Sequence, residues 1–110
     1  MKAPFKLVSN PTFRHLVPIM APVDGSSEEQ TLGVTYRVLD TSELARMETE
    51  MSAPDLAMAL VESIDGVVDG DGQTVAMNDR VKTSVLKLPF VTLAVLQHYR
   101  QAMAGAAAKN

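Results

Sequence analysis

Residues 32–39, LGVTYRVL, carry the clearest secondary-structure pattern in this sequence. Apolar side chains alternate with small or polar ones along the whole stretch. The residues of the apolar face are Leu32, Val34, Tyr36 and Val38, and those of the opposite face are Gly33, Thr35 and Arg37. A period of two residues predicts a β-strand with one buried face and one face in water, as is typical of antiparallel sheets.

A second strand is expected before this one, from about Thr12 to Ala21, with Phe13, His15, Val17 and Ile19 on one face. The preceding residues 1–10 are expected to form an extended arm, since Asn10 comes before a proline and so avoids the helical region. Two prolines, at positions 18 and 22, either place this strand at an edge of the sheet or end it early. The polar residues 24–29 are expected to form the loop, so that residues 11–40 make a β-hairpin or small sheet.

The hydrophobic period changes to a helical one after residue 40. The first expected helix is capped by Asp40, Thr41 or Ser42, and the second has Pro54 in its first turn and continues to Ile64. The third is capped by Asn78, and the last runs from about Phe90 to Met103. The sequence therefore predicts an α+β fold in one domain, residues 1–110. An N-terminal antiparallel β-hairpin or small sheet (11–40) is followed by a helical part (41–107), a bundle of about four α-helices with a short β-turn insertion.

Composition narrows the possible functions. The 110 residues contain no cysteine, which excludes disulfides, thiolate metal sites and cysteine nucleophiles. The net charge is −3, and lysine and arginine are scattered, so that nucleic acid is not an expected partner. No apolar run approaches the length of a membrane span, and the protein is expected to be cytosolic in its host cell.

The stretch Asp69-Gly70-Asp71-Gly72 lies within residues 64–77, IDGVVDGDGQTVAM, and raises the question of a cation site. In an EF-hand register the loop would start at Val67, an apolar residue, and would end without a carboxylate, so that too few anionic oxygens are present. A phosphate cradle is disfavoured because the aspartates would repel phosphate. The favoured interpretation is a turn between two short strands, 67–68 and 74–75, and no metal or cofactor is expected.

No constellation for catalysis stands out in the sequence. His15 and His98 are far apart in the chain, the latter on the polar flank of the last helix, and no His-x-x-x-His spacing is present. No serine lies in a Gly-x-Ser-x-Gly turn. We therefore expect a protein that is not an enzyme. A metal-dependent enzyme built on Asp69 and Asp71 is the contrasting hypothesis, and it requires that a divalent cation stabilise the fold.

The apolar stripe of the last helix has two interpretations. The stripe comprises Phe90, Leu93, Leu96 or Gln97, Tyr99 or Arg100, and Met103. In one interpretation it packs in the core against the sheet. In the other, Phe90, Leu93, Tyr99 and Met103 form a groove that binds a partner helix, and these four are the candidate partner-binding residues.

The order of segments resembles the tail assembly chaperones of long-tailed bacteriophages. The opening FKLVSNPTFRHLVPI is similar to theirs, a Pro-Thr-Phe strand followed by a second strand and a short helix. The block Asp65-Gly66-Val67-Val68-Asp69-Gly70-Asp71-Gly72 resembles their Gly-Val-x-Asp-x-x-Gly turn. It precedes a short strand, a short helix, Pro89 and a long last helix that ends in small residues, as in that family. Val68 stands where such proteins often carry other residues, and an aromatic residue that often precedes their Gly-Val is absent.

This resemblance implies a chaperone that binds and solubilises the tape measure protein and helps to recruit tail tube subunits, and a homo-oligomer is among the expected assemblies. It further implies action in the host cell cytoplasm and absence from the mature virion. The family also makes a longer product by programmed frameshifting. The last residues, Ala108-Lys109-Asn110, can be encoded by GCA AAA AAC, which contains the slippery string A AAA AAC. The alternative is another small phage structural protein, such as a tail completion or connector subunit, that is retained in the virion.

Overall fold

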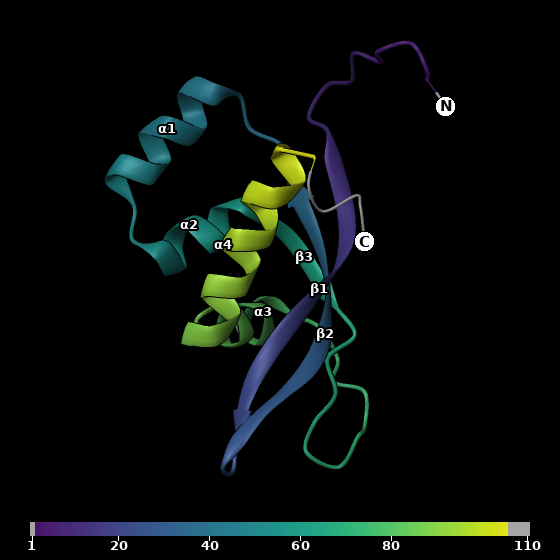
Figure 1. Cartoon of the computed structure of the whole chain (residues 1–110), viewed down its shortest axis with the longest axis vertical. Coiled ribbons are helices and arrows are strands. Elements are labelled where there is room, and N and C mark those ends of the chain that lie inside the picture. Colours follow the sequence, from purple (N-terminus) through teal and green to yellow (C-terminus); the bar gives the residue numbers. More distant parts are fainter. Residues whose placement is uncertain (1, 106–110) are drawn as a thin grey trace.

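The computed structural model describes residues 2–105, which form a three-stranded antiparallel sheet with four helices on one side of it (Figure 1). The strands are β1 (Thr12–Val23), β2 (Ser26–Arg37) and β3 (Val61–Asp65), and they lie in the order β1-β2-β3. The helices are α1 (Thr41–Glu50), α2 (Ala53–Leu60), α3 (Asp79–Leu86) and α4 (Pro89–Met103). The predicted α+β fold, with its N-terminal hairpin and its helices after the first two strands, is confirmed.

The hairpin of β1 and β2 is longer than expected. Its pairs run from Thr12 opposite Arg37 to Val23 opposite Ser26, so that the turn consists of Asp24 and Gly25 alone. The expectation of a polar loop over residues 24–29 is therefore wrong, because Gly25 adopts a φ of 71° and closes a tight turn. β1 is an edge strand, as the prolines predicted, but they do not end it early.

The second expected helix ends earlier than predicted. Residues up to Ile64 were expected to be helical, yet α2 ends at Leu60 and the next five residues form β3. The β-branched side chains of Val61 and Ile64 suit a strand, and β2 offers an unpaired edge where Ile64 lies opposite Val34. The preference of residues 61–65 for pairing with this edge of β2 therefore outweighs the preference for a helix that the spacing of the apolar residues indicated.

The helix starts follow the expected capping chemistry. The side chain of Asp40 accepts a hydrogen bond from the backbone N–H of Glu43, 2.8 Å away, and thus caps α1. Asn78 accepts one from Val81 in the same way, which confirms its predicted role as the cap of α3. Pro54 occupies the first turn of α2, where its missing N–H costs nothing.

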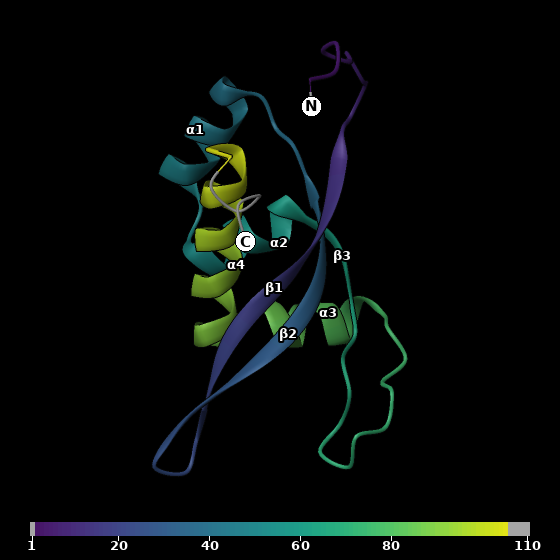
Figure 2. The ribbon, with the colours of Figure 1, turned by 45° about the vertical axis from the view of Figure 1, so that its right-hand side comes forward.

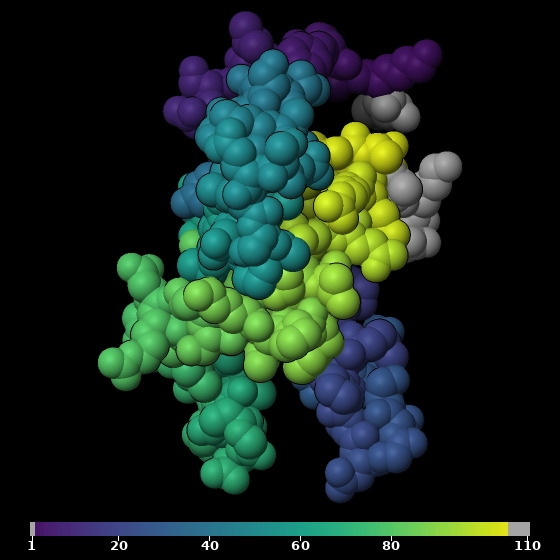
Figure 3. Space-filling model, turned by 90° about the vertical axis from the view of Figure 1, so that its left-hand side faces the viewer, coloured from purple at the N-terminus to yellow at the C-terminus, as the bar shows by residue number. Residues whose placement is uncertain are grey.

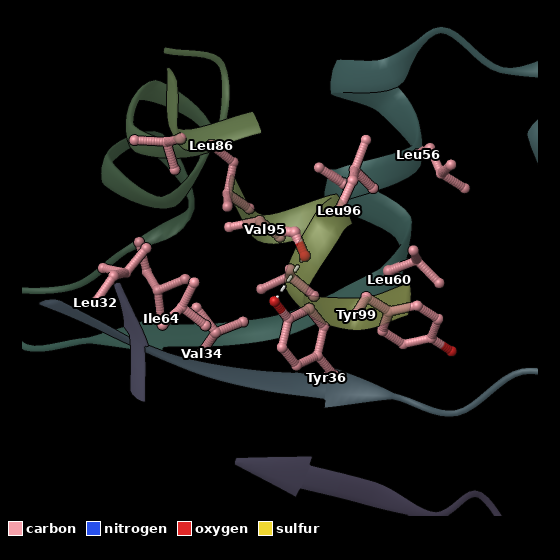
Figure 4. Close-up of a cluster of buried hydrophobic side chains, with 14 of the residues drawn as sticks. Leu32, Val34, Tyr36, Leu56, Leu60, Ile64, Leu86, Val95, Leu96 and Tyr99 are labelled. Carbon is pink, nitrogen blue, oxygen red and sulfur yellow. Dashed lines mark hydrogen bonds between the residues drawn. The ribbon is translucent and has the colours of Figure 1, made fainter. Parts of the chain in front are cut away.

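The core lies between the helices and the inner face of the sheet (Figure 4). Its central side chains are contributed by all three strands and by α2, α3 and α4. They include Val17, Val34, Tyr36, Leu60, Ile64, Leu86, Val95 and Tyr99. The hydroxyl of Tyr36 is buried and donates to the backbone oxygen of Val95, 2.8 Å away, and this bond joins the central strand to the middle of α4. Burial raises the pKa of this phenol, which stays protonated and able to donate.

Two segments project from the same end of the molecule, below the helices (Figures 2 and 3). One is the end of the β1–β2 hairpin around its turn, and the other is the segment 66–77 between β3 and α3. The arm, residues 2–10, leaves the sheet at the opposite end and is exposed throughout.

Candidate partner-binding site

The helix α4 has one buried face and one uncovered face. Its buried residues are Val91, Thr92, Val95, Leu96 and Tyr99. Two tyrosine hydroxyls fix this orientation: Tyr36 bonds to the Val95 oxygen, and Tyr99 donates to the backbone oxygen of Arg37 at 3.0 Å. Thr92 adds a hydroxyl bond to the Leu86 oxygen at the end of α3. The helix therefore cannot roll to bury another face without breaking these bonds.

Phe90 and Leu93 come together on the uncovered side of α4. They line a shallow groove of about 420 Å³ between α4 and β1. The other lining residues are Pro18 and Met20 from β1 and Ala94, Gln97, His98 and Gln101 from α4. The side chain of Leu93 is 67% exposed and that of Met20 is 52% exposed. Large apolar side chains that are exposed beside one another, without a formal charge in the lining, mark a surface suited to an apolar partner.

Tyr99 and Met103 line a second groove, of about 330 Å³, between α4, α1 and α2. Met103 is 45% exposed at its rim, whereas Tyr99 is 2% exposed and belongs to the core. Burial is the main reason why the pKa of Tyr99 is raised. Arg100 of α4 and Glu48 of α1 form an ion pair of 3.6 Å at this groove. The structure thus separates the four candidate residues into two pairs on different sides of α4.

A histidine pair was missed at the sequence level. Nδ1 of His15 on β1 lies 2.9 Å from Nε2 of His98 on α4, and one ring donates its proton to the other. Burial, and then the neighbouring His15, lower the pKa of His98, so that its neutral form is favoured. The strand alternation placed His15 on the inner face, but no local pattern indicates a partner 83 residues away.

The segment Asp69-Gly70-Asp71-Gly72 forms the predicted turn. Val68 bridges to Thr74, and the backbone N–H of Asp69 donates to the oxygen of Gln73 at 2.9 Å. One carboxylate oxygen of Asp69 accepts the N–H groups of Asp71 and Gln73 at 2.9 and 3.0 Å. Gly72 adopts a φ of 82°, which glycine alone reaches without strain. The Asp69 carboxylate is thus used by the turn itself, and the two expected strands shrink to a single bridge.

None of the helices in residues 2–105 lies over the outer face of the sheet (Figure 2). Arg14 of β1 and Asp65 of β3 form an ion pair across this face, with 2.8 Å between Nη2 and Oδ1. The pair passes directly over Gly33 of β2, where any β-carbon would overlap both side chains. The ion pair above position 33 thus explains why this position of β2 is a glycine.

Within residues 2–105, no three or more histidine, aspartate or glutamate side chains gather in a way that could hold a metal ion. Each helix in the same range is too short or too polar to span a lipid bilayer.

The family model described as phage tail assembly chaperone matches residues 1–110, the whole chain. Searches of curated proteins and of solved structures gave no match.

Proposed function

Because the chain belongs to the phage tail assembly chaperone family, we propose that it binds the tape measure protein and keeps it soluble during tail assembly. Family membership carries this proposal. Such a role requires no catalysis, and it is exercised in the cytoplasm of the host cell. We expect the protein to be absent from the finished virion, as befits a factor that is displaced when assembly is complete.

The groove between α4 and β1 is the surface that suits this partner best. A long helical protein aggregates unless its apolar face is shielded from water. From Pro89 to Tyr99, α4 carries no charged residue, and Phe90 and Leu93 meet Met20 in the groove. An amphipathic helix that lies in this groove buries its apolar residues against these side chains.

Met103 belongs to a second contact on the other side of α4. It is exposed beside Leu44 and Leu56 in the groove that α1 and α2 flank. Tyr99 lies beneath this groove and supports it from the core. Each copy of the chain thus offers two modest contacts, and many copies together coat a long partner by weak, multivalent binding. Tail tube subunits can later displace these copies.

We propose that a longer product of the same gene recruits the tail tube protein. A ribosome that slips at codons for Ala108-Lys109-Asn110 would extend the chain in another frame. These residues lie outside the described part of the structure, so this proposal depends on the gene. An alanine codon that does not end in A, or AAG for Lys109, removes the slippery string and contradicts the proposed frameshift.

The proposed function is tested by co-expression of the chain with the tape measure protein encoded beside it. We expect the tape measure protein to become soluble and to co-purify with the chain, whereas alone it is insoluble. Mass spectrometry of purified virions supplies the second test. Abundant chain in the virion would favour a retained structural subunit, such as a tail completion or connector protein, over a chaperone.

A further inference from the structure

The histidine pair lies at the groove between α4 and β1. His98 is one of the residues that line this groove, and His15 holds it from the strand, with 2.9 Å between Nδ1 of His15 and Nε2 of His98. Both residues are half-buried. A helix that binds in the groove therefore covers the pair further.

Two aromatic rings pack against the pair. The ring of Phe13 meets that of His15 edge to face, with 5.0 Å between the centroids, and the ring of Tyr36 is stacked on that of His98 at 6.3 Å. Packing of this kind restricts both imidazoles. A proton that the pair takes up thus remains in a poorly hydrated position, which disfavours the charged form.

The charged groups nearby are directed elsewhere. Arg14 of β1 pairs with Asp65 across the outer face of the sheet, and Arg100 of α4 pairs with Glu48 beside the second groove. From β2 the facing titratable group is the phenol of Tyr36, whose pKa is raised by burial, so that it stays neutral. Among the described residues, therefore, no carboxylate faces the pair to balance a positive charge.

The N–H···N bond of the pair requires that at least one of the two facing nitrogens carry no hydrogen. The bond forms when both rings are neutral and survives one added proton, whereas a second proton breaks it. The first added proton already places a positive charge in the groove that Phe90 and Leu93 line. Burial of an unpaired charge beneath an apolar partner is unfavourable.

We propose that the His15–His98 pair makes binding in this groove depend on pH. The groove holds an apolar helix while both rings are neutral, and it releases the helix when the pair takes up a proton. This inference rests on the proposed function of the groove as the binding surface for the tape measure protein.

The direction of the pH dependence follows from the burial of His98. Burial, and then the neighbouring His15, lower the pKa of His98 from its ordinary value of 6.5, and a bound helix buries His98 further and lowers this pKa again. The affinity is therefore complete above the pKa of His98 in the free chain and falls as the pH drops below it. One linked proton weakens binding by at most about tenfold for each pH unit.

Release of the chain from its complex with the tape measure protein tests this proposal. The tape measure protein carries a tag without histidine, is co-purified with the chain and is immobilised. We expect the dissociation constant of the wild-type chain to rise about fivefold or more between a pH of about 7.5 and a pH of about 5.5. Thermal melts at both pH values verify that the chain stays folded.

The histidine content of the chain allows a clean control. His15 and His98 are the only histidines, so that His15→Gln/His98→Gln removes both. Any pH dependence that remains in this variant belongs to carboxylates or to the partner. We expect its two dissociation constants to differ by less than about twofold.

A matched pair of lysine variants locates the charge. His98→Lys places a fixed positive charge at the pair, and it should bind at the higher pH as weakly as the wild type does at the lower pH. Gln97 lines the same groove but is exposed. Gln97→Lys should weaken binding less, because its ammonium group reaches water.

Three results would overturn the proposal: wild-type binding that does not change with pH, a pH dependence that persists undiminished in the variant without histidine, or equal effects of the two lysine variants. If the tape measure protein does not co-purify at either pH, the proposed function fails and this inference fails with it. If it co-purifies and its binding is independent of pH, the proposed function stands and the role of the histidine pair alone is refuted.

Discussion

The hydroxyl of Tyr36 is the most informative single group to remove from the core. Its side chain is 0% exposed, and its hydroxyl donates to the Val95 oxygen at 2.8 Å, so that one bond joins the central strand to α4. Tyr36→Phe deletes this donor and leaves a small void, while the Val95 oxygen keeps its place in the helical ladder. We expect the free energy of unfolding to fall by about 1 to 2 kcal/mol, or about 4 to 8 °C in Tm for a chain of this size.

The matched control is Tyr99→Phe. The Tyr99 side chain is buried, but the bond from its hydroxyl to the Arg37 oxygen, 3.0 Å long, is only part-buried because Arg37 is half-exposed, so that water can replace the lost donor. We expect a loss of less than about 1 kcal/mol. Urea unfolding followed by circular dichroism measures both variants. If Tyr36→Phe is as stable as the wild type, or less affected than Tyr99→Phe, the bond does not fix α4 on the sheet and the reasoning is refuted.

Three further predictions concern other parts of the fold. As pH falls from about 7 to 5, the Tm should decrease. The pKa of His98 is lower in the folded than in the unfolded chain, so the unfolded chain binds the proton first and is favoured. In thermal melts, His98→Gln should lose most of this dependence of Tm on pH. Gly33→Val should lower the Tm by displacing the Arg14–Asp65 pair. In a double-mutant cycle, Gly33→Val should have a smaller effect in an Asp65→Ala background, because Asp65 is the side chain that an added β-carbon meets first. Asp69→Ala should destabilise by about 1 kcal/mol while Asp69→Asn does not, since only the former loses the turn acceptor; an effect of calcium or EDTA on wild-type Tm would contradict this view of the loop.

The sequence predicts most strongly where a local pattern coincides with a local structure. The alternation in residues 32–39 predicted β2. The starts of α1 and α3 were predicted by capping side chains, Asn78 for α3 and one of Asp40, Thr41 or Ser42 for α1, of which Asp40 is the cap. Gly72 predicted a turn. In each case the interactions that decide the structure join residues a few positions apart in the sequence, so that the spacing of residue types predicts them directly.

Long-range interactions explain what the sequence did not predict. Ile64 has helical spacing to Leu60, but the open edge of β2, about 30 residues earlier, makes it a strand residue. The rotation of α4 depends on two tyrosine hydroxyls, one of which belongs to β2. For the same reason Phe90 and Leu93 lie apart from Tyr99 and Met103, although one helical stripe joined all four in the sequence.

The proposed binding of the tape measure protein to the exposed side of α4 can be tested with two single-residue variants. Two leucines allow a matched test, because Leu93 in the groove is 67% exposed and Leu16 on the outer face of the sheet is 60% exposed. The measurement is the amount of soluble tape measure protein that co-purifies with the wild-type chain, Leu93→Asp and Leu16→Asp. We predict that Leu16→Asp retains the partner as the wild type does and that Leu93→Asp loses most of it. Equal recovery of the tape measure protein with Leu93→Asp and with the wild type would contradict binding at this side of α4.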